Sequence, residues 1–339
     1  MGRRDKSYSK DLHQQVYDKL TSMQAFGESK REAIEDGTAK DKIFSFNTYK
    51  TYFKHAKYFI SYVKEQHPEC TTLKKAKSYV NEWLQTRVDA NLSAWTIATE
   101  QAALNKIYGI DPDDPKRFQP PKRRREDIKR SRVATARDKH FSVTNNDELI
   151  QFCKATGARR SELQKLTGFD LVTREQIERR IKQLENKKSL TAHEQKQMQM
   201  LKDTRLFTKG EEHFLYLKGK GGRERVTPII GKNADQVVAR MKATGKEEKV
   251  WKHVHTDADI HGYRADYATQ MYKTYARDIK DIPYDKINKG TGKKYQSEVY
   301  TCRKDERGRK LDKHAMKVCS KALGHNRIEV VANNYIRGL

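Results

Sequence analysis

The sequence TGARRSEL, residues 156–163, has a pair of adjacent arginines, the first of which stands two residues after a glycine. Before it, residues 145–148 offer capping side chains, and apolar residues then follow at helical spacing. We therefore predict a helix that stops before Gly157, with Arg159 at the start of the next helix. Because a guanidinium stays protonated and can bind two oxygens at once, Arg159 is a candidate ligand for a phosphate.

Downstream of this motif, two short apolar runs flank a glycine-rich turn. The runs are residues 214–217 and 226–230, and the turn is Gly219-Lys220-Gly221-Gly222. Such runs on both sides of a glycine turn are typical of a β-hairpin, which would put Lys220 near its tip. Residues 174–202, between the motif and the hairpin, are charged and rich in glutamine with helical spacing. They predict an inserted helical pair outside the core.

The last third of the chain is predicted to be mostly helical from His261 onward, with a polar interruption between about residues 281 and 309. It carries the sequences HGYR (261–264) and LGH (323–325), and a late tyrosine, Tyr335. His261 and Arg264 are three residues apart and would share one face of a helix.

The sequence pattern predicts that the first third of the chain is helical. Apolar residues at intervals of three and four between residues 49 and 63 predict an amphipathic helix with Asn47 as its N-cap, ending before Pro68. Similar patterns predict helices over residues 12–23, 73–84 and 95–107, the last one marked by Trp95, Ala98, Ala102 and Ile107. At Ile110 the pattern gives way to prolines and then to a run of cations. We predict a helical domain over residues 1–115, a basic linker over 116–138, and a second domain over 139–339 with the insertion at about 174–202.

Composition narrows the class of partner. The 339 residues include 71 Lys and Arg against 45 Asp and Glu, a formal charge of +26, which favours a polyanion such as nucleic acid. The stretch behind the basic N-terminus is not apolar, and the longest apolar runs fall short of a membrane span, so we expect neither secretion nor membrane binding. Four cysteines far apart, without metal-ligand spacing, predict reduced thiols and no zinc site. A cytoplasmic location follows as an expectation.

These motifs resemble, in their order, the tyrosine recombinase (phage integrase) family over roughly residues 141–335. The resemblance implies that Arg159, His261, Arg264 and His325 hold a scissile phosphate and that Lys220 protonates the departing 5′ oxygen. Tyr335 would be the nucleophile that forms a 3′-phosphotyrosyl link, with no metal and no cofactor. Further DNA contacts are expected from the linker and the hairpin: Lys122, Arg123, Arg124, Arg125 and Arg223.

The resemblance also implies a fold and an assembly. It predicts a multidomain, mainly α protein with a small β-hairpin or sheet: a helical, SAM-like core-binding domain and a mixed α+β catalytic domain, closed as a C-shaped clamp on double-stranded DNA. The expected function is site-specific recombination, integrating and excising a mobile element. Four protomers would act on two duplexes, with a DNA-bending or excision factor as a further partner. A bacterial or phage-encoded, nucleoid-associated protein is expected.

Several alternatives stay open from the sequence. A type IB topoisomerase would use similar residues and the same covalent link, and a DNA-binding regulator would keep the scaffold without the chemistry. Tyr300 and Tyr295 are fallback nucleophiles. Either His325 or Lys220 is a candidate to take the phenolic proton, and the tyrosine would serve its own site or that of a neighbouring protomer.

Overall fold

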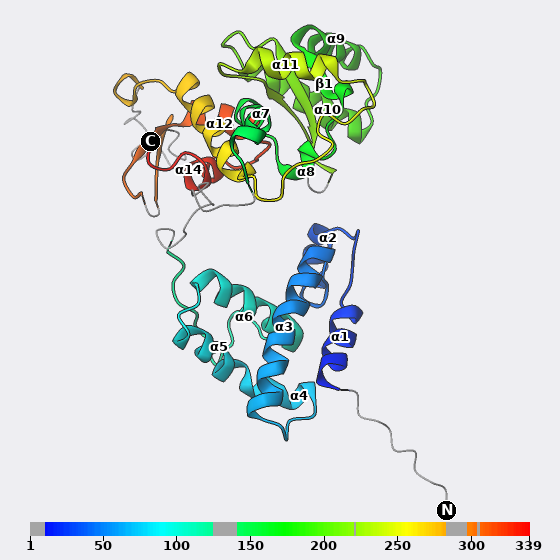
Figure 1. Ribbon diagram of the computed structural model, residues 1–339, viewed down its shortest axis with the longest axis vertical. Helices are drawn as coiled ribbons and strands as arrows, with labels where there is room; N and C mark the ends of the chain where they lie inside the picture. Colours follow the sequence, from blue (N-terminus) through cyan, green and yellow to red (C-terminus); the bar gives the residue numbers. More distant parts are fainter. Residues whose placement is uncertain (1–10, 125–140, 220–221, 283–296, 304–305) are drawn as a thin grey trace, which may run out of the picture. The chain divides into compact units, whose positions relative to one another are not determined.

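The computed structural model describes residues 11–124, 141–219, 222–282, 297–303 and 306–339 (Figure 1). The chain divides into two compact units, Met1–Ile128 and Lys129–Leu339. Both units are built mainly from helices, and the strands of the second unit form small antiparallel sheets. This agrees with the prediction of a mainly α protein with a small β-hairpin or sheet. In the described parts of the chain, no helix combines the length and the apolar character needed to cross a bilayer.

The first unit is helical. Its elements are α1 (Leu12–Ser22), α2 (Lys30–Glu35), η1 (Ala39–Asp41), α3 (Phe46–Gln66), α4 (Leu73–Ala76), η2 (Lys77–Tyr79), α5 (Val80–Asp89) and α6 (Ala94–Tyr108). The long helix α3 packs against α1 and α6, and α5 packs against α6. Fully buried apolar side chains from these helices, among them Leu20, Phe59, Leu84 and Leu104, form its core. The four predicted helical regions are confirmed.

Two details of this unit differ from the sequence prediction. The N-cap of α3 is Ser45 and not Asn47, because the Ser45 hydroxyl accepts the Thr48 backbone N–H at 3.2 Å. Helix α6 forms as expected but buries a different face, with Trp95 37% exposed and Glu100 fully buried. The carboxylate of Glu100 accepts two hydrogen bonds from Arg87, each at 3.1 Å, and this pairing lets a charged residue lie on the buried face.

The second unit combines helices with two small sheets. Its helices are η4 (Thr144–Asn146), α7 (Asp147–Thr156), α8 (Arg160–Leu163), η5 (Gly168–Asp170), α9 (Arg174–Glu185), α10 (Ala192–Asp203), η6 (Thr204–Leu206), α11 (Ala234–Ala243), α12 (Ile260–Tyr275), η8 (Ile279–Asp281), α13 (Lys313–Ala322) and α14 (Glu329–Asn334). Helix α12 packs against both α7 and α13. Helix α7 stops at Gly157, which adopts a left-handed conformation as predicted.

The strands confirm the hairpin and add a second one. Strands β1 (Leu171–Thr173), β2 (His213–Lys218) and β3 (Glu224–Pro228) form an antiparallel sheet in that order, with Leu215 of β2 opposite both Leu171 and Thr227. Lys220, the predicted tip residue, lies outside the described residues. Within the polar interruption, β4 (Val299–Thr301) and β5 (Lys310–Asp312) form a second hairpin. The sequence did not predict β4 and β5, because strands of three residues are too short to show an alternation of apolar and polar side chains.

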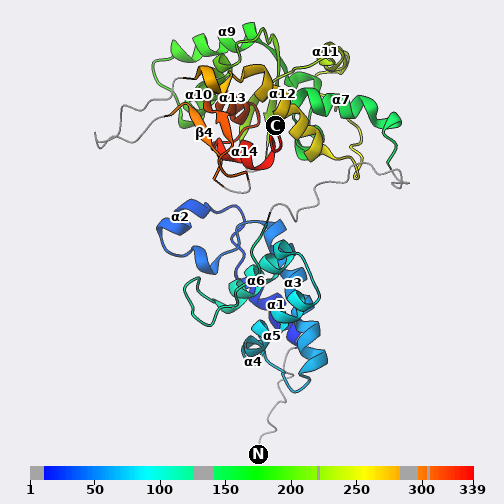
Figure 2. The same ribbon diagram turned by 90° about the vertical axis from the view of Figure 1, so that its left-hand side faces the viewer.

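The predicted insertion belongs to the core, which corrects the expectation that it lies outside. Ile177, Ile181 and Leu184 of α9 and Leu201 of α10 are at most 5% exposed and join the apolar cluster that includes the hairpin and α12–α14. Their spacing of four and three residues is hidden among charged neighbours. Asp203, the last residue of α10, also pairs with Lys321 of α13 at 2.6 Å; both helices are labelled in Figure 2. The insertion is therefore tied to the helix that leads into the LGH motif.

Candidate active site

The first arginine of TGARRSEL is held at the N-terminus of α8. The backbone N–H of Arg159 donates to Oε2 of Glu162 at 2.7 Å, and its Nη1 donates to Oε1 of the same carboxylate at 2.7 Å. Its Nη2 donates to the carbonyl of Leu323 at 3.2 Å. About a third of the Arg159 side chain stays exposed. The guanidinium is thus fixed in orientation and still accessible to an anion.

The second arginine has a different task. Arg160 donates from Nη1 to the carbonyls of Val254 and His255, and from Nη2 to those of Thr256 and Ala258, at 2.5–3.3 Å. These carbonyls belong to the segment that leads into α12. Arg160 therefore fixes the approach to the helix that carries HGYR, whereas Arg159 faces the candidate site.

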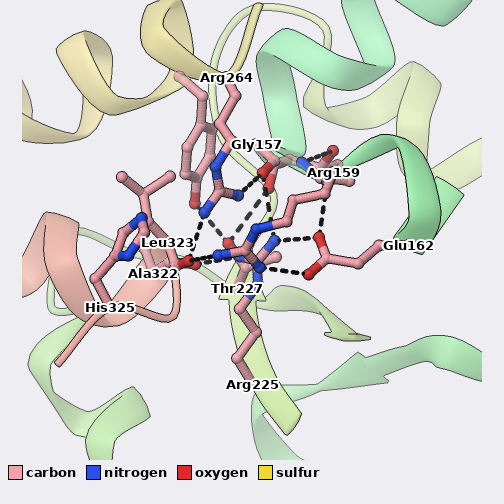
Figure 3. A network of polar contacts seen from close by, with 12 residues as sticks. Gly157, Arg159, Glu162, Arg225, Thr227, Arg264, Ala322, Leu323 and His325 are labelled. Atoms are coloured by element: carbon pink, nitrogen blue, oxygen red, sulfur yellow. Dashed lines mark hydrogen bonds and ion pairs between the residues drawn. The ribbon is translucent and has the colours of Figure 1, made fainter. Parts of the chain in front are cut away.

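The carbonyl of Gly157 joins two buried arginines (Figure 3). Arg264 donates to it from Nη1, and Arg225 of β3 donates to it from Nη2 at 3.3 Å. Gly157 has φ +58°, and a Cβ there would lie 2.4 Å from Cδ1 of Tyr267. Only glycine fits this turn without strain, and the turn aims the carbonyl at both guanidinium groups.

Arg264 lies on α12 and is 1% exposed. It donates from Nη2 to the carbonyl of Leu323 at 2.5 Å and from Nε to the hydroxyl of Tyr335 at 3.3 Å. Burial, with repulsion from Arg225 as a smaller cause, lowers the pKa of Arg264 to about 10. The group therefore remains a cation at neutral pH and links the nucleophile candidate to the arginine cluster.

Tyr335 follows the last residue of α14 and is 7% exposed. Its hydroxyl is 3.2 Å from Nε2 of His325, and the ring of His261 stands perpendicular to its ring at a centroid distance of 5.7 Å. The structure thus brings five of the six predicted catalytic residues together in one chain: Arg159, His261, Arg264, His325 and Tyr335. The sixth, Lys220, lies outside the described residues.

His325 is neutral at physiological pH. Burial lowers the pKa of its imidazole to about 4, and the positive charges of Arg264, Arg159, Arg225 and Arg223 act in the same direction. A neutral imidazole nitrogen beside a phenolic hydroxyl can accept its proton. Among the described residues, no three His, Cys, Asp or Glu side chains gather in a way that would hold a metal ion.

The sequence reasoning missed two residues of this site, Glu162 and Arg225. The Glu162 carboxylate is fully buried and pairs with Arg225 at 2.7 Å as well as with Arg159. Burial alone would raise the pKa of Glu162, but the charge and hydrogen bonds of Arg225 and Arg159 outweigh it and hold the pKa at about 2. One signal was available: a glutamate three residues after an N-cap position is typical of a capping box.

The remaining candidates are spread more widely. Arg223 is exposed and donates to Oδ1 of Asn326, and it lines a hollow of about 290 Å³ with Arg159 and His325. Lys122, Arg123 and Arg124 are exposed at the end of the first unit, whereas Arg125 lies outside the described residues. Arg123 stacks over Trp95 at 5.1 Å from the ring centroid. The fallback tyrosine Tyr300 packs against the apolar cluster, and Tyr295 lies outside the described residues.

No protein family profile and no curated protein matches this sequence. Among solved structures, the crystal structure of XerA recombinase aligns with 95% of this chain and 94% of its own, at 13% identity and a TM-score of 0.26. A likeness this distant carries no argument about the site. The functional interpretation therefore depends on the side-chain geometry.

Proposed function

We propose that this protein is a tyrosine-type DNA strand transferase that cleaves and rejoins DNA through a phosphotyrosyl intermediate. The observation that supports it most is the position of the Tyr335 hydroxyl, within hydrogen-bond distance of both Arg264 and His325. Arg159 flanks the same site with its guanidinium accessible. A phenol, a neutral imidazole and fixed cations are the groups that in-line attack on a phosphodiester needs.

The proposed reaction is balanced without an external energy source. The phenolic oxygen of Tyr335 forms a bond to phosphorus while the bond from phosphorus to the 5′ oxygen breaks. His325 takes the phenolic proton, and Lys220 gives a proton to the departing 5′ oxygen. Arg159, Arg264 and the nearby His261 stabilise the charge on the non-bridging oxygens. Attack by another strand's 5′ hydroxyl reverses these steps and restores the tyrosine.

We further propose that the reaction is site-specific recombination that integrates and excises a mobile element. Exchange between two duplexes needs one nucleophile for each of four strands, which a tetramer with each tyrosine acting in its own site would supply. The first unit and the cations Lys122, Arg123 and Arg124 would hold the duplex through its phosphates. A DNA-bending factor would assist the assembly.

The direct test is covalent capture on DNA. Full-length protein is incubated with a library of nicked, random-sequence duplexes whose short fragment diffuses away after cleavage, and adducts are resolved under denaturing conditions. We expect wild type and Tyr300→Phe to form an adduct and Tyr335→Phe to bind DNA with little change but form none. If Tyr335→Phe still formed an adduct, another residue would be the nucleophile.

A second measurement separates recombination from topoisomerase activity. The captured sequences are cloned in pairs on a supercoiled plasmid. We expect recombinant products that require both copies. Relaxation of plasmids that lack the site, without recombinants, would instead identify a type IB topoisomerase. If the protein formed no adduct with any DNA, it would be a DNA-binding protein without strand-transfer activity.

A further inference from the structure

Next to the candidate active site is a second, larger hollow, and most of the residues that line it have no part in the proposed chemistry. Its volume is about 700 Å³, and it is formed by α10, the hairpin and the turn between α13 and α14. It shares Arg223, Arg225, Gly324 and His325 with the smaller hollow beside Arg159. An occupant of the larger hollow would therefore lie directly beside the group bound by the catalytic arginines.

The lining of this hollow is strongly cationic. The described residues around it include the cations Lys196, Lys218, Arg223, Arg225 and Lys321, against the carboxylates Asp203 and Glu224. Asp203 is paired with Lys321, and Arg225 with the buried Glu162. Within the part of the chain that the structure describes, the side-chain amines of Lys196 and Lys218 form no hydrogen bond or ion pair. Two unpaired cations facing one concavity favour binding of an anion.

Helix α10 holds Lys196 in a fixed position. Leu201, five residues further on the same helix, is buried in the core, and Asp203 at its end is paired with α13. A threonine N-cap at Thr191, with Glu194 completing a capping box, fixes the start of the helix. Lys196 is therefore carried by a packed helix and not by a free surface loop, so it can define a position on a ligand.

We propose that Lys196, with Lys218 and Arg223, binds the backbone phosphate that neighbours the scissile phosphate on the cleaved strand. This inference rests on the proposed function and extends it, because it gives the α9–α10 insertion a role in positioning DNA. Successive phosphates on one strand carry single negative charges a few ångströms apart, which matches two adjoining cationic hollows that share a wall. Lys196 is a positioning residue that does not touch the reacting atoms.

The first test is the salt dependence of DNA binding by full-length protein. A duplex selected by covalent capture serves as the probe, and affinity is measured by fluorescence anisotropy across a series of salt concentrations. Affinity falls with rising salt, and loss of one phosphate contact makes the slope of log affinity against log salt shallower by about 0.9. At 0.15 M salt this change corresponds to about a fivefold loss of affinity. We expect this change for Lys196→Ala and recovery with Lys196→Arg.

The matched control is Lys188→Ala. Lys188 is exposed in the turn between α9 and α10 and does not line the hollow, so it makes the same charge change within the same insertion. We expect it to keep the wild-type slope. Equal losses for Lys188→Ala and Lys196→Ala would mean that only the overall charge matters, and the proposal would be wrong.

The second test locates the contact. A neutral methylphosphonate replaces one phosphate at a time on either side of the mapped cleavage position. At the adjacent phosphate, wild type should lose at least about fivefold in affinity and Lys196→Ala should lose clearly less, because one of the three contacts to that phosphate is already missing. Additive losses at every position would overturn the proposal. Failure of the proposed function is seen separately, as absence of a wild-type adduct.

Discussion

The guanidinium of Arg264 contacts Tyr335 in two ways: its Nε donates to the tyrosine hydroxyl at 3.3 Å, and its central carbon lies 5.5 Å from the ring centroid. Arg264 is itself held by the carbonyls of Gly157 and Leu323, which come from two different turns. One buried cation therefore connects three segments that are far apart in sequence. In the proposed reaction it would orient the nucleophile and stabilise the phosphate together.

The depressed pKa of His325 predicts a dependence of stability on pH. The pKa of its imidazole is about 4 in the folded protein and 6.5 ordinarily, with burial as the main cause. Between these values the unfolded state binds the proton and the folded state does not, so falling pH favours unfolding. The loss begins near pH 6.5 and is complete below about pH 4.

Thermal unfolding of wild type and His325→Gln measures this effect. We expect the melting temperature of wild type, relative to that of His325→Gln, to fall steadily from pH 7 to pH 4.5. Other titrating groups act equally on both proteins and cancel in the difference. A difference that stays constant over this range would show that His325 titrates normally.

The two adjacent arginines should fail in different ways. Arg159→Ala should slow formation of the covalent adduct by at least about 100-fold, the scale of losing one preorganised donor to a developing charge. Arg160→Ala removes four hydrogen bonds to the segment before α12 and should lower the free energy of unfolding by about 2 kcal/mol. Both variants are measured by single-turnover cleavage and by urea unfolding. Slow cleavage by a stable Arg160→Ala, with normal cleavage by a destabilised Arg159→Ala, would contradict this assignment.

Sequence reasoning succeeded where the signal is local. The stop of α7 at Gly157, the start of α8 after Arg159 and the β2–β3 hairpin each follow from a few neighbouring residues with defined conformational preferences. The spacing of the late motifs also directed attention to Tyr335 among 17 tyrosines. The structure places it beside His325 and Arg264.

It failed where a residue's environment comes from distant parts of the chain. Glu162 and Arg225 are 63 residues apart, and nothing in either neighbourhood shows that they form a buried pair. The α9–α10 insertion looked external because its few apolar residues are diluted by charge, yet Ile181 is fully buried. Glu100 misled the assignment of the buried face of α6, since its partner Arg87 lies on another helix.

The buried pair leads to a prediction about stability. Glu162→Gln leaves the charge of Arg225 uncompensated inside the protein and should destabilise it by about 3 kcal/mol. Glu175→Gln is the control, because its carboxylate is 80% exposed and its pair with Arg179 on α9 should contribute no more than about 0.5 kcal/mol. Urea unfolding of both variants measures the difference. Similar small losses would mean that the Glu162 pair contributes little to folding.

Gly157 and Gly109 provide a matched comparison of backbone strain and packing. Both end a helix in the left-handed conformation, with φ +58° and +59°. A Cβ at Gly109 meets nothing within 4 Å, so Gly109→Ala should cost only the conformational penalty of about 1 kcal/mol. Gly157→Ala pays the same penalty and also pushes its Cβ into the ring of Tyr267, which adds about 1–3 kcal/mol.

The packing cost at Gly157 should also reach the site. Tyr267 is fully buried and its hydroxyl is bonded to Thr227 and to the carbonyl of Pro228, so the ring cannot easily move away. The backbone of residue 157 must shift instead, and with it the carbonyl that holds Arg264 and Arg225. We therefore expect Gly157→Ala, at temperatures where it remains folded, to form the adduct more slowly than Gly109→Ala. Equal rates would show that the Gly157 carbonyl does not position these arginines for catalysis.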